Sequence, residues 1–157
     1  MSKLRDVGIE FLDAAPVRWD FEAEVAAPRE AVFGAIAERA DWPWFPGLTG
    51  ERYDGPQPYG VGTRRHIRMA GVAYHETIVA WSAPSRWAFR VDECSVPMGR
   101  ALVEEWSFTE SGAGTTVRWS FALDPTPVFG AMKALAPTVM RALFQRAMRN
   151  LERQLSS

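Results

Sequence analysis

Six strand-like segments follow one another between residues 49 and 123, separated by turn residues and by no helical pattern. Strands joined by short turns pair antiparallel, because a parallel connection needs a crossover of about a dozen residues. The segments cover residues 49–54, 62–69, 72–81, 86–93, 101–110 and 115–123. This run predicts an antiparallel meander, in which each strand lies beside the next.

Residues 17–25 precede the run and predict a seventh strand. Val17, Trp19 and Phe21 alternate there with charged residues, which is the pattern of a strand with one buried and one wet face. Pro28 then suits the first position of a short helix. The segment 41–47 is too rich in proline for a regular helix and is expected to form one short turn that carries aromatic side chains.

The C-terminal region has a helical pattern with an internal proline. Thr126 can cap a first piece that Pro127 starts. Pro137 lacks a backbone donor and would cost about 3 kcal/mol inside a helix, which predicts a break near Ala136. The long second piece covers residues 138–154. Its expected apolar stripe consists of Val139, Met140, Leu143, Ala147 and Leu151.

Together these elements predict an α+β fold, in which a seven-stranded curved antiparallel sheet carries two short N-terminal helices and a long C-terminal helix. The chain of 157 residues fits a single domain over 1–157, with a core at about 17–155. Seven Trp and nine Phe are the unusual feature of the composition. Aromatic side chains bury large apolar areas, so they either fill a thick core or line a pocket.

Charge, hydropathy and cysteine content exclude several classes of function. The net charge is −1 without a long basic run, so nucleic-acid binding is not expected. No apolar stretch approaches the ~18 residues that cross a bilayer. Residues 1–10 are charged and unlike a signal peptide, so we expect a cytoplasmic protein. Cys94 is the one cysteine, and with two His it predicts no metal site and no cofactor.

The order of elements resembles a known superfamily. The opening "VAAPREAVFGAIAERADWPWFP" has its first-strand-to-helix pattern, and "ETIVAWSAPSRWAFRV" and "EEWSFTESGAGTTVRWSF" match its central strands. The chain is similar to the START/Bet v 1-like, or helix-grip (SRPBCC), superfamily, and within it to the polyketide cyclase/dehydrase and lipid-transport group. The resemblance covers nearly all of 17–155. It carries no catalytic motif, so no catalytic residue is transferred from it.

The resemblance implies an elongated cavity between the sheet and the long helix, with an apolar small molecule as the binding partner. Inward register and helical spacing nominate twelve residues for its walls. They are Trp19, Phe21, Arg65, Ile67, Met69, Trp87, Phe89, Trp106, Trp119, Phe121, Met132 and Met140. The aromatic members are also ordinary core residues, and methionines give adaptable apolar walls.

The hairpin at 62–81 decides which polar groups face the cavity. If Ala70 and Gly71 form a two-residue turn, Arg65 lies opposite Glu76 on the inner face and His75 lies outside. A three-residue loop would instead place His75 inside. An inward Arg65 can orient a ligand carbonyl or phenolate, or it can form a structural ion pair at the cavity rim.

The last hairpin places a further acid on the inner face. A loop at 111–114 pairs Glu110 with Thr115 and sets Glu104 opposite Phe121. Glu104 is a candidate general base if burial raises its pKa, or a hydrated carboxylate near one end of the sheet. Tyr74 completes the set of weak catalytic candidates, which are Arg65, Tyr74, Glu76 and Glu104.

Three functions remain open on the sequence. The first is a carrier or binder of a lipid-like or aromatic polyketide-like molecule, and the second is an aromatase/cyclase-type enzyme that acts on such a molecule. The third is a protein-interaction module with a filled core. A ligand-sized cavity favours the first two, and a buried ionisable group without a neutralising partner favours the enzyme. The sequence does not decide the oligomeric state.

Overall fold

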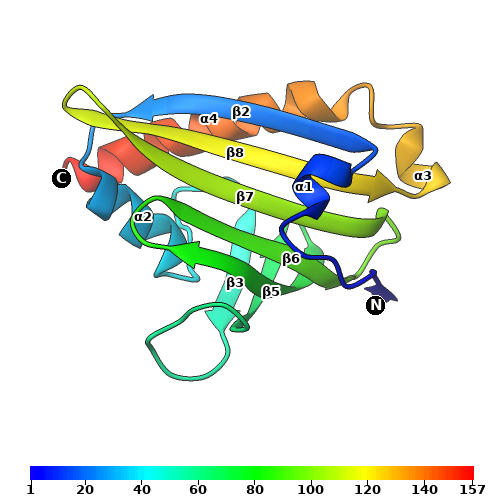
Figure 1. The fold of residues 1–157 in the computed structure, drawn as a ribbon. Coiled ribbons are helices and arrows are strands. Elements are labelled where there is room, and N and C mark those ends of the chain that lie inside the picture. Colours follow the sequence, from blue (N-terminus) through cyan, green and yellow to red (C-terminus); the bar gives the residue numbers. More distant parts are fainter.

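A curved antiparallel sheet lies against a long C-terminal helix in the computed structural model, which describes residues 1–157 (Figure 1). The strands are β1 (Ser2–Lys3), β2 (Val17–Val25), β3 (Leu48–Tyr53), β4 (Arg64–Met69), β5 (Val72–Ser82), β6 (Arg86–Cys94), β7 (Gly99–Ser111) and β8 (Gly114–Pro125). The helices are α1 (Phe11–Ala14), α2 (Arg29–Ala37), α3 (Pro127–Gly130) and α4 (Ala136–Leu155). None of these helices combines the length and apolar character needed to cross a bilayer.

The strand order is β2-β8-β7-β6-β5-β4-β3, which confirms the antiparallel meander. β2 pairs with β8 along its whole length, so the first long strand lies beside the last one and forms one edge of the sheet. The short β1 pairs with β6 and is an eighth strand that the alternation pattern did not reveal. Register shifts in β5 and between Gly99 and Ala101 mark bulges, which bend strands and help the sheet to curve.

The two hairpins have the register that their turns predicted. Ala70 and Gly71 have φ values of 50° and 85°, as a type I′ two-residue hairpin turn requires at both positions. Arg65 therefore pairs with Glu76, and His75 lies on the outer face. In the last hairpin Glu110 pairs with Thr115 as expected, and the neighbouring Ser111 and Gly114 also pair, which shortens the connection to two residues.

The short helices differ from the expected arrangement. Residues 41–47 form no second helix, because Pro43 and Pro46 lack the backbone N–H that a helix needs, and they make the expected short turn, in which the Phe45 N–H donates to the Trp42 carbonyl. Trp42 and Trp44 stack on each other there and pack into the core instead. The second short helix is α1, which precedes β2 and covers the opposite face of β7 and β8 from α4 (Figure 1).

Prolines shape the C-terminal region as predicted. The Thr126 hydroxyl accepts a hydrogen bond from the Phe129 N–H at the start of α3. A turn at 131–135 separates α3 from α4, and Pro137 lies in the first turn of α4, where its missing donor has no helical partner to lose. The break near Ala136 is confirmed, although α4 begins two residues before the expected start.

The two halves of α4 meet the sheet differently. In the C-terminal half, Phe144, Ala147, Met148 and Leu151 are fully buried against the inner face of the sheet. In the N-terminal half, Val139 of the same apolar stripe is 57% exposed. The core is thus filled under one end of the helix and leaves space under the other.

Candidate ligand cavity

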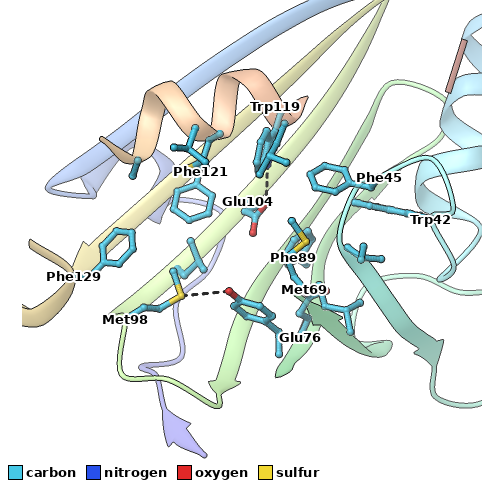
Figure 2. Close-up of a pocket in the computed structure, with 18 of the residues that line it drawn as sticks. Trp42, Phe45, Met69, Glu76, Phe89, Met98, Glu104, Trp119, Phe121 and Phe129 are labelled. Atoms are coloured by element: carbon cyan, nitrogen blue, oxygen red, sulfur yellow. Dashed lines mark hydrogen bonds between the residues drawn. The ribbon is translucent and has the colours of Figure 1, made fainter. Parts of the chain in front are cut away.

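The space under the N-terminal half of α4 is a cavity of about 510 Å³. It lies between the inner face of β4–β8 and the α3–α4 segment, and 20 of its 23 lining residues are hydrophobic (Figure 2). A volume of this size falls within the range of small-molecule sites in proteins. The third function considered from the sequence, an interaction module with a filled core, does not match this interior.

Nine of the twelve residues nominated from the sequence line the cavity. They are Arg65, Ile67, Met69, Phe89, Trp106, Trp119, Phe121, Met132 and Met140. Trp19, Phe21 and Trp87 do not line it. Phe21 and Trp87 are 3% and 0% exposed, and Phe21 packs on Phe144 of α4 where the helix touches the sheet. Trp19 stacks on Phe121, its cross-strand partner on β8, at 5.8 Å between ring centroids.

Other lining residues were not nominated. Leu102 lies two residues before Glu104 on the same strand face, so the period-2 pattern alone would have found it. Trp42 and Phe45 reach the cavity from the proline-rich segment, for which no face could be assigned. Leu48 and Met98 also line the cavity, and the α3–α4 segment adds Phe129, Ala131, Leu135, Ala136, Val139 and Leu143.

The α3–α4 segment also forms the mouth of the cavity. Met132, Leu135 and Val139 line the cavity and yet are 61%, 73% and 57% exposed. Side chains that contact both the interior and solvent stand at an opening. This opening therefore has an apolar rim.

Arg65 and Glu76 form a buried ion pair at the cavity wall. Arg65 Nη1 donates to Glu76 Oε2 at 2.8 Å, and the two side chains are 0% and 1% exposed. Arg65 Nη2 donates to the Ala40 carbonyl at 3.3 Å, and the guanidinium lies 4.4 Å from the centroid of the Trp42 ring. The pair is buried and does not lie at an exposed rim of the cavity, which was one alternative considered from the sequence. Burial raises the pKa of Glu76 to about 7, and Arg65 opposes that shift.

Glu104 is the second acid at the cavity. The Trp119 indole N–H donates to Glu104 Oε1 at 2.7 Å, and Figure 2 shows this carboxyl group among the aromatic lining residues. The Glu104 side chain is partly buried and lines the cavity. It is therefore not a hydrated carboxylate near one end of the sheet, which was the alternative considered from the sequence. Burial, reinforced by the charge of Glu76, raises the pKa of Glu104 to about 8. Glu104 is therefore mostly a neutral acid at pH 7.

The remaining titratable residues considered from the sequence are Tyr74, the two histidines and Cys94. Tyr74 lines the cavity and its hydroxyl points to Met98 Sδ at 3.7 Å, while burial raises the pKa of Tyr74. His66 and His75 pack edge to face on the outer side of the sheet, where His66 contacts Asp54 at 2.8 Å. Cys94 is buried at the end of β6. No group of three or more His, Cys, Asp or Glu residues is arranged to hold a metal ion.

An apolar cavity held between a curved antiparallel sheet and a long C-terminal helix defines the helix-grip, Bet v 1-like class of proteins. The chain belongs to the family described as polyketide cyclase/dehydrase and lipid transport, which matches residues 17–156. It is 30% identical to an uncharacterized protein of Mycobacterium tuberculosis over 150 residues, which are 94% of this chain and 89% of the relative.

Solved structures share the fold at low sequence identity. One is the di-domain ARO/CYC protein BexL of the BE-7585A biosynthetic pathway, with a TM-score of 0.72 and 12% identity over 90% of this chain and 50% of BexL. Another is Ara h 8.0201, with a TM-score of 0.65 and 11% identity over 86% of this chain and 97% of that protein. At such identities the likeness concerns the fold.

Proposed function

We propose that this protein binds an apolar small molecule, lipid-like or aromatic polyketide-like, in the cavity between its sheet and α4. The observation that carries the proposal is the 510 Å³ interior space with a hydrophobic lining and an opening at the α3–α4 segment. Apolar surface that leaves water for such a cavity gains about 25 cal/mol per Å². The family description, which includes lipid transport, supports the same function.

Narrowing the cavity is expected to weaken binding. Met140→Trp adds an aromatic ring to the wall beneath α4, and we expect it to weaken binding of the uncharged fluorophore N-phenyl-1-naphthylamine about tenfold or more, because the probe and the ring compete for the same space. A fluorescence titration measures this. Val61→Trp is the control, since Val61 is 69% exposed and does not line the cavity. Equal affinity in wild type and Met140→Trp would refute binding at this site.

One observation favours a second candidate function, an aromatase/cyclase-type enzyme in the same cavity. Glu104 is a cavity-facing acid that no basic group contacts, and its raised pKa places it near the pH at which an acid–base group works best. Aldol condensation followed by dehydration needs one group that moves a proton and a cavity that holds the chain folded. The dehydration releases one water from the substrate.

Native mass spectrometry separates the two candidates. Wild type and Glu104→Gln are each purified from the protein's own organism, and the masses of their bound ligands are compared. An enzyme is expected to carry product in the wild type and a precursor heavier by one water in Glu104→Gln. The same ligand mass in both proteins supports a carrier.

A further inference from the structure

Exposed hydrophobic side chains cluster around the mouth of the cavity. Val128 of α3 is 72% exposed, and Met132, Leu135 and Val139 follow it along the rim. The other exposed large hydrophobic residues are spread over residues 1–96, whereas α3 and the start of α4 lie together at one end of the molecule (Figure 1). We call these four residues the mouth patch. Clustered exposed apolar side chains mark a surface that meets another apolar body.

The segment that carries the mouth patch also has unpaired positive charge. Residues 125–151 contain no acidic residue and four basic ones, although the net charge of the whole chain is −1. The four are Lys133, Arg141, Arg146 and Arg149, and all are exposed. Every ion pair of the structure joins residues between positions 5 and 124. None of these four cations is therefore neutralised by a carboxylate.

Two of the cations lie beside the mouth patch on its exposed side. Lys133 follows Met132 in the turn between α3 and α4. Arg146 comes about two helical turns after Val139, so both side chains project from the same side of α4, at a distance of about 10 Å along the axis. Exposed apolar side chains flanked by cations are typical of a segment that lies in the interface of a membrane.

We propose that the mouth patch and its flanking cations dock the protein on the surface of an anionic lipid bilayer, with the cavity opening towards the lipid. This inference goes beyond the proposed binding function, because docking needs no ligand in the cavity. The apolar side chains enter the boundary between headgroups and acyl chains, and the cations contact lipid phosphates. An apolar molecule then passes between bilayer and cavity without exposing its surface to water.

A second copy of the chain fits this surface less well than a bilayer does. A two-fold dimer places the same patch of each copy against the other. It would bring the unpaired cations of both copies together with no acid between them, and like charges at an interface are unfavourable. An anionic bilayer supplies the missing negative charge and leaves the mouth of the cavity open to its acyl chains.

Sedimentation with lipid vesicles tests the docking. Vesicles of phosphatidylcholine alone are compared with an equal mixture of phosphatidylcholine and phosphatidylglycerol, which is anionic. We expect the protein to bind the mixed vesicles about tenfold more tightly or better. High salt is expected to weaken this binding, because it screens the attraction between exposed charges.

Lys133→Gln/Arg146→Gln removes two of the cations. One cation near an anionic bilayer contributes about fivefold to the affinity, so the double variant is expected to bind the mixed vesicles about tenfold more weakly or worse. Arg64→Gln/Arg68→Gln is the control, since both arginines are exposed on the outer face of β4, beside His66 and away from α4. It changes the net charge equally and is expected to bind within about twofold of wild type.

Val128→Gln tests the apolar part of the surface. Val128 and Val61 are 72% and 69% exposed, and neither lines the cavity. The change at Val128 is expected to weaken binding to the mixed vesicles about fivefold, because a polar amide replaces an apolar group at the lipid interface. The same change at Val61, in the loop before β4, is expected to have no effect.

Binding of N-phenyl-1-naphthylamine without vesicles separates this inference from the proposed function. Val128, Lys133 and Arg146 do not line the cavity, so their variants are expected to bind the fluorophore as wild type does. If the fluorophore binds but vesicles do not, or if both kinds of vesicle bind equally, docking is wrong and the binding function stands. If vesicles bind but the fluorophore does not, the binding function is wrong and docking stands.

Two further results would overturn the inference. Equal losses of vesicle binding in Val128→Gln and Val61→Gln, or in the two double variants, would mean that the contact is not at the mouth. A wild type that is dimeric by size-exclusion chromatography and binds no vesicles, together with a monomeric Val128→Gln, would assign the mouth patch to a second copy of the chain.

Discussion

Replacing Arg65 by methionine is expected to destabilise the protein by about 3–5 kcal/mol at pH 7, because it leaves a buried acid without its partner. Arg65 and Glu76 are both almost completely buried and are joined at 2.8 Å. Methionine has a similar length but no charge, so Glu76 would keep its negative charge in an apolar wall or take up a proton. The contact of Arg65 with the Ala40 carbonyl, which anchors the segment after α2, would also be lost.

Urea denaturation of wild type, Arg65→Met and the double variant Arg65→Met/Glu76→Leu measures this effect. The double variant removes both charges, so it is expected to recover most of the lost stability. The loss in Arg65→Met is also expected to be smaller at pH 5 than at pH 8, because a protonated Glu76 needs no partner. If the single and double variants were equally unstable at both pH values, packing of Arg65 on Trp42 would explain the loss, and the ion pair would not.

Glu104→Gln is expected to stabilise the protein increasingly as pH rises. The folded chain holds the Glu104 proton up to a pKa of about 8, while an unfolded chain releases it at about the ordinary value of 4.5. Unfolding therefore releases a proton between these values, so the stability of the wild type falls as pH rises from 4.5 to 8 and levels off above 8. Glutamine does not titrate, and the gain is expected to reach about 1–4 kcal/mol above pH 8.

Free energies of unfolding at pH 5, 7 and 9 for wild type and variant give the difference directly. Glu76 titrates in both proteins, so its contribution largely cancels from the difference. Glu105→Gln, on the outer face, is expected to show no such growth with pH. A constant difference between pH 5 and pH 9 would mean that Glu104 has an ordinary pKa in the folded protein.

The sequence predicted the sheet well because local rules decide it. Alternation fixes which side chains share a face, and the Ala70-Gly71 turn fixes the register of the hairpin that pairs Arg65 with Glu76. The α1 helix and β1 were missed because elements of four and two residues are too short to show a period. The proline-rich segment 41–47 depends on tertiary packing of its tryptophans, which no local pattern encodes.

The cavity was harder to predict because alternation gives the face of a residue and not its depth along the strand. Phe21 and Phe121 share the inner face, but Phe21 lies beneath Phe144 of α4, while Phe121 lies where the helix stands off. The surroundings of Glu104 depend in the same way on where α3 and α4 lie. Its burial could not be decided before the helix was placed on the sheet.

The cavity draws its polar groups and its opening from separate stretches of the chain. Arg65, Glu76 and Glu104 belong to β4, β5 and β7 of one sheet, whereas the mouth is formed by the turn at 131–135 and the first turn of α4. Mutations in the mouth can thus alter the size of an admitted molecule while the recognition chemistry stays intact. Relatives of this protein could diversify in cargo by changing one short stretch, and a protein engineer could exploit the same separation by randomising residues 131–143 alone.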